Sequence, residues 1–521
     1  MTSGARKYNM TDNKPSNIRN IISKIISLVV QFIVSFAVAG IIVREWGNEG
    51  NGYYQLSNDF VTYAEVISVA LNSLAARFIT ISLAKDDNDE VNKYFNTVLF
   101  ANIFLAASLL IPVIAVVLNL QKMINISDKM IFDVKLLLFF MMLNFLLSIA
   151  ASVFGVANYA RNRIDIGCWR DIESFVLKII IILVGVMYFH MPIWIIAVAS
   201  VVSSIYIIIR NVFFTRRMLP DVKPFQWKSF DWHRVKTLVT SGMWNSFTRF
   251  GAILLGGLDV LIANLFVSTN AMGMISISKT IPKYILASIA GIATVFAPGI
   301  MIAFAKSDKN DMVDRLKRGI AFCSFLAIPM EIAVIAFGER LFRLWMPGQD
   351  SKMLLYISII SIAGYVVVLP LEVLWSVFTA LNKVRISSIY LMIEAVIVIM
   401  TVFFLLQTTD NEMYKMCIIA GVSSVFEIIR GFFFLPVVSA KLIKVPVKTF
   451  YVPLLKALVS FAVSLIFSFT LNNIVSSADR WIILIALCLA STVISFGVSF
   501  YIVLDKVERR RLYSFFRRSA A

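Results

Sequence analysis

The feature that most constrains the fold of this chain is a series of long apolar runs. Each run has about twenty residues, the length that a helix needs to cross the hydrocarbon core of a bilayer. Hydrophobic residues make up 59% of the 521-residue chain, charged residues make up 15%, and the mean hydropathy is +0.83, whereas soluble domains are about half apolar and a quarter charged. Because helices satisfy their own backbone groups inside lipid, we predict an all-α polytopic membrane protein with about 14 transmembrane helices. The runs lie at residues 20–43, 53–83, 94–118, 134–157, 168–188, 192–214, 237–266, 273–304, 316–337, 353–380, 387–406, 413–438, 449–472 and 480–503.

The distribution of basic residues predicts how these spans are oriented. If both termini are cytoplasmic, 33 of the 49 Lys and Arg residues fall in inner loops and tails, nine fall in outer loops, and seven lie within spans. Such an excess on one side is the positive-inside signal of a multi-pass protein. It also accounts for the formal net charge of +18 without a nucleic-acid partner, because no soluble basic domain is evident.

An internal repeat divides the chain into two halves. The segment 52–89 aligns without a gap on 273–310, so that Gly52 meets Gly273 and Asp87 meets Asp308. Six spans per repeat give both halves the same direction in the membrane, the parallel arrangement found in some transporters. We therefore predict six parts: a cytoplasmic N-terminal tail (1–19), a first lobe (20–214), a cytoplasmic inter-lobe linker (215–236), a second lobe (237–440), two further helices (441–504) and a basic cytoplasmic C-terminal tail (505–521).

Sequence signals for catalysis and for metal binding are missing. The four cysteines show no paired spacing, there are only two histidines, and neither pattern supports a disulfide framework or a metal site. "GNEGNG" (47–52) is interpreted as a polar outer loop and not as a nucleotide-binding fingerprint. We expect no enzyme activity and no cofactor, so that the energy for any transport would come from substrate flux or from H⁺ or Na⁺ gradients.

Charged residues at membrane depth are the candidate functional groups, because burying them in lipid is costly. Lys279 and Lys283 are four residues apart, on one helix face, and Pro282 between them frees a backbone carbonyl one turn earlier and favours a kink. Together with two arginines they predict a ladder of positive charge for an anionic substrate such as a phosphate. The substrate-binding candidates are Arg77, Arg249, Lys279 and Lys283.

Acidic residues at similar depth allow two interpretations. Asp59 and Asp259 could neutralise the lysines as structural ion pairs, in competition with the substrate-path interpretation. Alternatively, carboxylates could bind coupling H⁺ or Na⁺, for which the candidates are Asp59, Glu65, Asp259 and Glu372. A structural role is expected for the other charged residues near span ends, with Glu427 and Arg430 neutralising each other; these residues are Glu173, Glu331, Glu394, Glu427, Arg430 and Lys456.

Several motifs resemble a known family. "WGNEGNGYYQLSNDF" after the first span, "ANYARNRI" after the fourth and "TALNKVRI" after the tenth are similar to the polysaccharide-transporter branch, including O-antigen flippases, of the multidrug/oligosaccharidyl-lipid/polysaccharide (MOP) exporter superfamily. The likeness covers residues 20–440, and the last two spans look like the C-terminal addition of some members.

This resemblance implies a V-shaped, MATE-like pair of six-helix lobes with a cationic cavity, which would flip undecaprenyl-diphosphate-linked oligosaccharide across the bacterial cytoplasmic (inner) membrane by alternating access. The implied partners are this lipid-linked substrate for O-antigen, lipopolysaccharide or capsule, membrane lipids, and a glycan polymerase with other assembly proteins. Two alternatives stay open: a cation-coupled drug or metabolite exporter of the same superfamily, and a membrane glycan polymerase or ligase.

Overall fold

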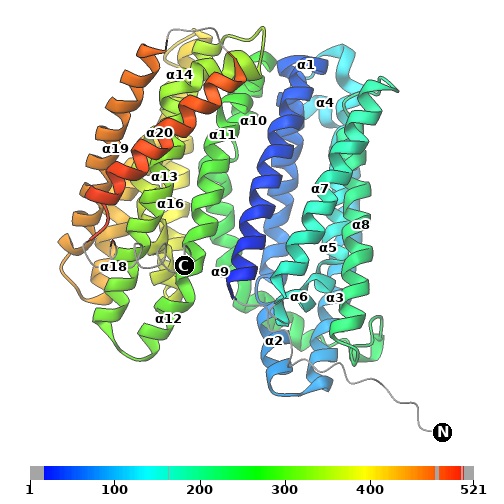
Figure 1. Cartoon of the computed structure of the whole chain (residues 1–521). Helices are drawn as coiled ribbons and strands as arrows, with labels where there is room; N and C mark the ends of the chain where they lie inside the picture. The colour runs from blue at the N-terminus through cyan, green and yellow to red at the C-terminus, as the bar shows by residue number, and fades with distance from the viewer. Residues whose placement is uncertain (1–16, 162, 476–479, 506–508, 510–521) are drawn as a thin grey trace. The chain divides into compact units, whose positions relative to one another are not determined.

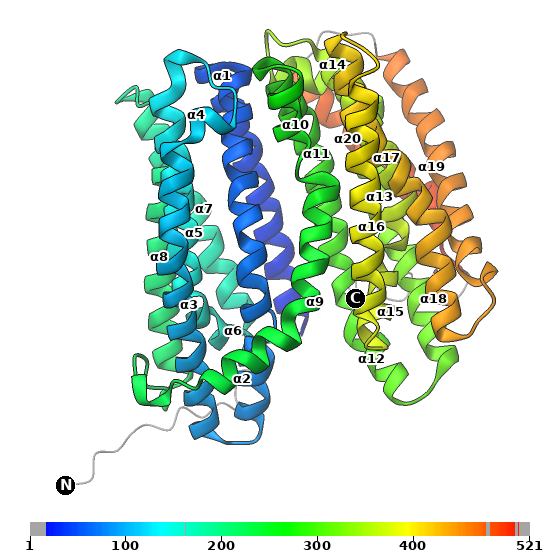
Figure 2. The same ribbon diagram turned by 180° about the vertical axis from the view of Figure 1, so that it is seen from behind.

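A computed structural model describes residues 17–161, 163–475, 480–505 and 509 of the chain (Figures 1 and 2). Within these residues the secondary structure is helical, without a β-strand, which confirms the predicted fold class. The contacts divide the chain into two units, 1–38 with 60–123 and 128–246, and 39–59 with 124–127 and 247–521. The first nine helices are α1 (Asn17–Asn72), α2 (Ala75–Ala84), α3 (Asn88–Leu118), α4 (Leu120–Met123), α5 (Ile131–Ala150), α6 (Val156–Ala160), α7 (Ile164–Met187), α8 (Ile195–Met218) and α9 (Trp232–Gly256).

The remaining helices belong to the second unit. Three short turns of other helical types interrupt them: the 3₁₀ turns η4 (Thr294–Phe296) and η5 (Leu369–Leu374), and the π-helical turn η6 (Arg430–Phe434). The α-helices are α10 (Asp259–Phe266), α11 (Thr269–Ala293), α12 (Ala297–Ala305), α13 (Lys309–Trp345), α14 (Ser351–Val368), α15 (Trp375–Ala380), α16 (Val384–Leu406), α17 (Glu412–Ile429), α18 (Leu435–Ile443), α19 (Lys448–Ile474) and α20 (Trp481–Ile502).

These helices account for the fourteen predicted spans. Eleven helices or helix runs in the described residues are long and apolar enough to cross a membrane, and the pair α9–α10, bent by 43°, makes a twelfth. One of the eleven, Ile22–Leu83, contains two predicted spans that Gly47 separates. α7 is not among them because of its five charged residues, yet its 24 residues cover the fifth predicted span.

The predicted outer loop at 47–52 is wrong. This segment is helical and continues α1, and only Gly47 leaves helical geometry, with φ 71° and ψ −173°. Glycine adopts this conformation without steric cost, so the chain can change direction at one residue and resume the helix at once. Polar residues in this segment therefore lie on a helix and not in a loop.

The repeat is visible in the backbone of the two halves. Asp86 and Ser307, which the repeat alignment places at equivalent positions, both have positive φ, 55° and 56°. The next residues, Asp87 and Asp308, are the N-caps of α3 and α13, and each side chain accepts a hydrogen bond from the backbone N–H three residues later, at 3.0 and 2.9 Å. The same local structure at equivalent positions confirms that the alignment reflects duplicated architecture.

The fourth and tenth predicted spans also end alike. In the first half, α5 is followed by a 3₁₀ turn, η2 (Ser152–Gly155), and the short helix α6. In the second half, α14 is followed by η5 and the short helix α15. The breaks occur next to the "ANYARNRI" and "TALNKVRI" motifs, so these motifs mark equivalent turns of the two halves.

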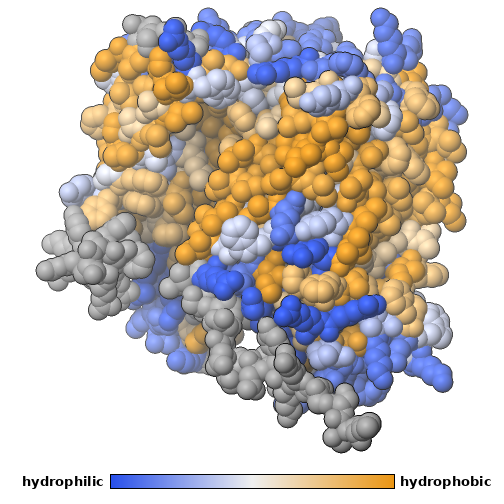
Figure 3. Space-filling view, turned by 45° about the vertical axis from the view of Figure 1, so that its right-hand side comes forward, coloured by the Kyte–Doolittle hydropathy of each residue, from blue (hydrophilic) through white to orange (hydrophobic). Residues whose placement is uncertain are grey.

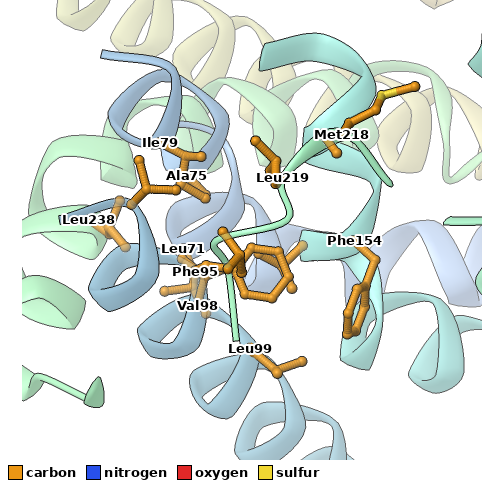
Figure 4. Close-up of a cluster of buried hydrophobic side chains, with 14 of the residues drawn as sticks. Leu71, Ala75, Ile79, Phe95, Val98, Leu99, Phe154, Met218, Leu219 and Leu238 are labelled. Carbon is orange, nitrogen blue, oxygen red and sulfur yellow. The ribbon is translucent and has the colours of Figure 1, made fainter. Parts of the chain in front are cut away.

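The first unit has its main described apolar cluster where α1, α2, α3, η2, α8 and α9 meet (Figure 4). Phe95 of α3 is completely buried there and packs edge-on against Phe154, with ring centroids 5.4 Å apart. Leu238 of α9 joins the same cluster. The first turns of α9 are thus anchored in the core of this unit.

The predicted inter-lobe linker is fastened to α3. Asn96 donates to the backbone oxygen of Lys223 and accepts from the backbone N–H of Gln226, both at 2.9 Å. Arg234 makes a bidentate contact with Glu90, at 2.5 and 2.8 Å. The linker is consequently part of the first unit, whereas the sequence analysis placed it between the lobes.

In the second unit, α19 and α20 pack on each other and on α13 through a cluster of buried apolar residues. Ser460 and Ser468 of α19 hydrogen-bond to Ser499 and Ser491 of α20, at 2.9 and 2.6 Å. Small polar residues at such a seam let membrane helices approach closely. On the outer sides large apolar residues are exposed, and Figure 3 shows apolar residues gathered in a broad band on the face in view, between hydrophilic residues above and below.

Candidate functional site

Two of the candidate lysines lie on one face of α11 and meet two of the candidate aspartates. Lys279 forms an ion pair with Asp259, and both side chains are buried, with exposed fractions of 9% and 7%. Lys283 lies 3.8 Å from Asp59, and the charges of Lys279 and Asp259 also act on Asp59. The structure therefore brings together four residues that the sequence analysis selected for two different roles.

The break between α9 and α10 places Asp259 in this cluster. α9 ends at Gly256, Gly257 follows, and Asp259 is the first residue of α10. Two adjacent glycines make the bend easy, because neither has a Cβ to restrict the backbone. A carboxylate in the first turn of a helix is also favoured by the helix dipole. The local sequence thus explains why this aspartate turns toward α11.

Lys283 differs from Lys279 in its surroundings. Its side chain is 35% exposed, and its distance of 3.8 Å from Asp59 is longer than that of a hydrogen bond. Gln55 donates to one carboxylate oxygen of Asp59 at 3.0 Å, and the other oxygen is buried without a hydrogen-bond partner in the described residues. Lys283 is therefore loosely held and accessible, whereas Lys279 is fixed.

The backbone of α11 shows the effect of Pro282. α11 runs without a break from Thr269 to Ala293, but Pro282 has no N–H to donate to the carbonyl of Ser278, four residues earlier. Ser358 of α14 supplies the missing hydrogen bond, at 2.8 Å from its hydroxyl to the Ser278 oxygen. The carbonyl that the proline was predicted to free is thus satisfied by a neighbouring helix.

Next to the site, the part of α1 that follows Gly47 crosses α11 at close range. A Cβ atom on Gly273 would lie 2.4 Å from the backbone oxygen of Asn48, and one on Gly52 would lie 3.1 Å from the backbone nitrogen of Gly273. Next to this contact, Asn51 donates to the hydroxyl of Ser276 at 2.6 Å. The repeat-related glycines therefore pack against each other, and only the smallest residue fits at either position.

A second charged cluster lies around Arg430. Its guanidinium contacts Glu394 at 3.1 Å and Glu427 at 3.7 Å. The expected neutralisation of Glu427 by Arg430 is thus present, but the shorter contact is with Glu394. Glu372, a predicted coupling residue, lies on η5, where the charge of Arg430 acts on it.

The other predicted residues lie outside these clusters. Arg77, on α2, and Glu65, on α1, belong to the first unit. Arg249, on α9, belongs to the second unit, and both arginines are exposed. Of the four basic residues predicted to bind the substrate, the structure places two, Lys279 and Lys283, in one cluster.

Sequence reasoning missed the supporting residues of the site. Gln55 and Ser358 are neutral residues in apolar spans, and only their contacts with Asp59 and with the Ser278 carbonyl show their importance. The Glu394–Arg430 pair left a signal, because Glu173 and Arg210 occur at nearly the same repeat positions. Among the described residues no group of three or more His, Cys, Asp or Glu side chains could hold a metal ion.

Known solved structures show the same fold. An inward-facing multidrug resistance MATE family transporter of the MOP superfamily matches with a TM-score of 0.65 and 12% identity, over 83% of this chain and 99% of that one. The lipid II flippase MurJ, in an inward closed conformation, matches with a TM-score of 0.63 and 15% identity, over 93% of this chain and 99% of that one. The part of this chain that the MurJ match leaves uncovered is shorter than the segment 448–502, so the match includes part of α19–α20.

Sequence comparisons point the same way. The membrane protein EpsK of Bacillus subtilis (strain 168), described as uncharacterized, is 23% identical over 489 residues, which are 92% of this chain and 94% of the relative. The model of a family described as polysaccharide biosynthesis protein matches residues 18–302, more than half of the chain. The chain therefore belongs to the polysaccharide biosynthesis protein family and has the fold of the MOP superfamily.

Proposed function

We propose that this protein is a flippase that moves undecaprenyl-diphosphate-linked oligosaccharide, an O-antigen or capsule repeat unit, across the bacterial cytoplasmic membrane by alternating access. Membership in the polysaccharide biosynthesis family supports a role in glycan export. The fold match to a structure named as a lipid II flippase, which includes part of the two C-terminal helices, supports a lipid-linked substrate. In this proposal the chain is not an enzyme, and both termini are cytoplasmic.

The observation that carries the proposal is the accessible ammonium group of Lys283. It lies fourteen residues after the start of α11, about 21 Å along the helix axis, which is deep within a membrane span. A charged group at that depth is expected to face a protein interior or a water-filled path rather than lipid. Because Asp59 holds Lys283 only loosely, a diphosphate oxygen can compete for it.

The other cations take different parts in the proposed path. Arg77 and Arg249 are exposed on their helices, so they are suited to bind the diphosphate, since a guanidinium contacts phosphate in a bidentate manner. Lys279 is buried against Asp259, and we assign it the role of keeping α10 and α11 in register. The substrate then passes from the two arginines to Lys283, while its polyprenyl chain stays in lipid.

Charge-changing variants test this proposal. A host strain that lacks this gene is complemented with Lys283→Glu, Arg77→Ala or wild type, and surface polysaccharide and membrane-inserted protein are quantified. Loss of one charge-assisted contact of about 1.5–3 kcal/mol lowers transport by about ten- to a hundredfold. Lys456→Met is the matched control, because Lys456 pairs at 2.6 Å with Asp505 near the C-terminal end of the described chain. Wild-type surface polysaccharide in both test variants would refute the cationic path.

A reconstituted assay separates the proposed function from the alternatives. Proteoliposomes that contain the full chain are loaded with undecaprenyl-diphosphate-linked oligosaccharide, and its transfer between leaflets is measured. We expect transfer without change in oligosaccharide length. Elongation of the glycan would indicate a polymerase, and export of cationic drugs without lipid transfer would indicate a drug exporter.

A further inference from the structure

The two halves of the chain each contain a Glu–Arg pair that joins two neighbouring helices. In the first unit, Arg210 of α8 lies 3.3 Å from Glu173 of α7. In the second unit, Arg430 lies 3.1 Å from Glu394 of α16. The repeat alignment places the two glutamates at equivalent positions and the two arginines one position from equivalence, so the duplication preserved this contact.

A third residue distinguishes the two pairs. In the first unit Tyr206 donates its phenolic hydrogen bond to Glu173. The equivalent residue of the second half is Glu427, which lies 3.7 Å from Arg430. A tyrosine is a neutral donor at physiological pH, whereas a glutamate can donate only when it carries a proton. The second half has thus replaced a neutral donor with an ionisable group.

Burial sharpens this difference. The first pair is partly exposed, with 45% for the Glu173 side chain and 36% for Arg210. In the second pair the exposed fractions are 2% for Glu394 and 12% for Arg430. Unpaired charges are much more costly in the buried site than in the exposed one. The added carboxyl therefore lies where its charge has the larger energetic consequence.

The charges around Glu427 do not balance when every group is ionised. Arg430 on the same helical segment contacts two carboxyls, Glu394 of α16 and Glu427 itself, and the charge of a third, Glu372 of η5, also acts on it. Lys279 of α11 and Asp259 of α10 also act on Glu427, but they neutralise each other, and Tyr365 of α14 is uncharged and adjacent. The two carboxylates in contact with the one guanidinium already leave one negative charge in excess, which a buried site does not hold without a compensating cation.

The contacts favour a proton over a metal ion as that cation. The guanidinium of Arg430 contacts both Glu394 and Glu427, so it occupies the position between the carboxylates that a metal ion would need. A proton requires no such space, since it bonds to a single carboxylate oxygen.

Among the three carboxyls, Glu427 is the one best placed to exchange the proton. Glu394 receives two contacts from one nitrogen of Arg430, at 3.1 and 3.2 Å, and Glu372 forms no ion pair with Arg430 among the described residues. Glu427 is at 3.7 Å from Arg430 and is 18% exposed, the largest fraction in this group of ion pairs.

The backbone next to Glu427 is adapted to this carboxyl. A Cβ atom on Gly364 of α14 would lie 2.3 Å from a carboxylate oxygen of Glu427, so the glycine leaves the space that the carboxyl fills. The π-helical turn η6 starts at Arg430, whereas the equivalent α8 is a regular α-helix around Arg210. Turns of this type are often found at functional sites.

We propose that Glu427 carries an exchangeable proton, which adds to one carboxylate oxygen and is released again, and that this proton is the coupling ion of the transporter. The coupling role of this proton rests on the proposed function, whereas the presence of an exchangeable proton on Glu427 does not. The coupling carboxyl is then Glu427, in place of the sequence-based candidates Asp59, Glu65, Asp259 and Glu372.

Infrared spectroscopy tests the proton directly. Difference spectra between acidic and alkaline buffer are recorded for the full chain in lipid nanodiscs, in H₂O and D₂O, and the carbonyl band of protonated carboxyls is followed. We expect Glu427→Gln, which has the same shape, and Glu427→Tyr, which restores the first-half residue, to remove one pH-dependent component. Glu331→Gln is the control, because Glu331 is a buried carboxyl without an ion-pair partner among the described residues, and the component should persist in it. Persistence in both Glu427 variants, or loss in Glu372→Gln alone, would overturn the proposal.

A transport assay tests the proton site on Glu427 separately from the proposed flippase function. In proteoliposomes with lipid-linked oligosaccharide, an imposed pH gradient should accelerate transfer by wild type and have no effect on Glu427→Gln. Equal acceleration of both would refute Glu427 as the coupling group. If no lipid transfer occurs in wild type while the infrared component depends on Glu427, the proposed function fails and the proton site stands.

Discussion

Replacing Ser358 by alanine tests how the fold tolerates a proline in the middle of a charged helix. The Ser358 hydroxyl contacts two backbone oxygens at 2.8 Å, those of Ser278 on α11 and Leu354 on its own helix. The Leu354 oxygen can still accept from the backbone N–H four residues later, as in a regular helix. The Ser278 oxygen cannot, because the residue four positions later is Pro282, which has no N–H. The substitution therefore leaves one buried carbonyl without a hydrogen bond.

The expected cost follows from that single carbonyl. An unsatisfied buried acceptor costs about 1–3 kcal/mol, and hydrogen bonds between membrane helices give about 0.6–2 kcal/mol, so we expect Ser358→Ala to destabilise the fold by about 1–2 kcal/mol. In a Pro282→Ala background residue 282 regains its N–H and can donate to the Ser278 oxygen. There Ser358→Ala should cost less than about 0.5 kcal/mol, which gives a coupling energy of about 1 kcal/mol between the two sites.

Equilibrium unfolding in mixed micelles of mild and denaturing detergent measures these differences. The four proteins of the cycle are compared at equal concentration, together with Ser361→Ala as the control. The Ser361 hydroxyl bonds only to Ile357 of its own helix, at 2.9 Å, and its loss should cost less than about 0.5 kcal/mol. A Ser358→Ala effect that is the same with and without Pro282 would refute the account of the freed carbonyl.

Two further predictions concern the same helices. Asp259→Asn and Lys279→Met should each destabilise the protein by about 3–5 kcal/mol by leaving a buried charge unpaired, and the double variant should recover most of this loss; additive unfolding energies would show that the two residues do not form a pair. Gly273→Ala should lower the melting temperature of the purified protein and its surface-polysaccharide yield, because its Cβ would lie 2.4 Å from the backbone oxygen of Asn48, whereas Gly291→Ala on the same helix, with nothing within 4 Å, should preserve both. Equal melting temperatures for these two variants would contradict the close helix crossing.

Local sequence was sufficient to predict the spans and the duplication. Long apolar runs have few alternatives to transmembrane helices, because lipid offers no partner for unpaired backbone groups. The repeat was readable at Asp87 and Asp308 because a helix N-cap depends on a few adjacent residues. The loop predicted at 47–52 was wrong because polar residues usually indicate a loop, while a glycine can redirect a helix without ending it.

The sequence suggested Asp59 and Asp259 as partners of the two lysines, but it could not predict how tightly each lysine is held or how deeply it is buried. Lys279 and Lys283 are equivalent in spacing and in helical face, yet one is buried against Asp259 and the other is 35% exposed beside Asp59. This difference depends on which neighbouring helix approaches each side chain, and such contacts join residues that are far apart in the chain. A periodic pattern carries no information about them.

What the sequence by itself determined is therefore the helical membrane fold, its two-fold repetition and the set of residues that carry charge at membrane depth. The tertiary structure decided which of these charges are neutralised. It fixed Lys279 with Asp259, left Lys283 accessible, and placed Arg430 in contact with Glu394 and Glu427. The physical reason is that hydrophobicity acts on each segment separately, whereas the free energy of a buried charge depends on the groups that packing brings within a few ångströms.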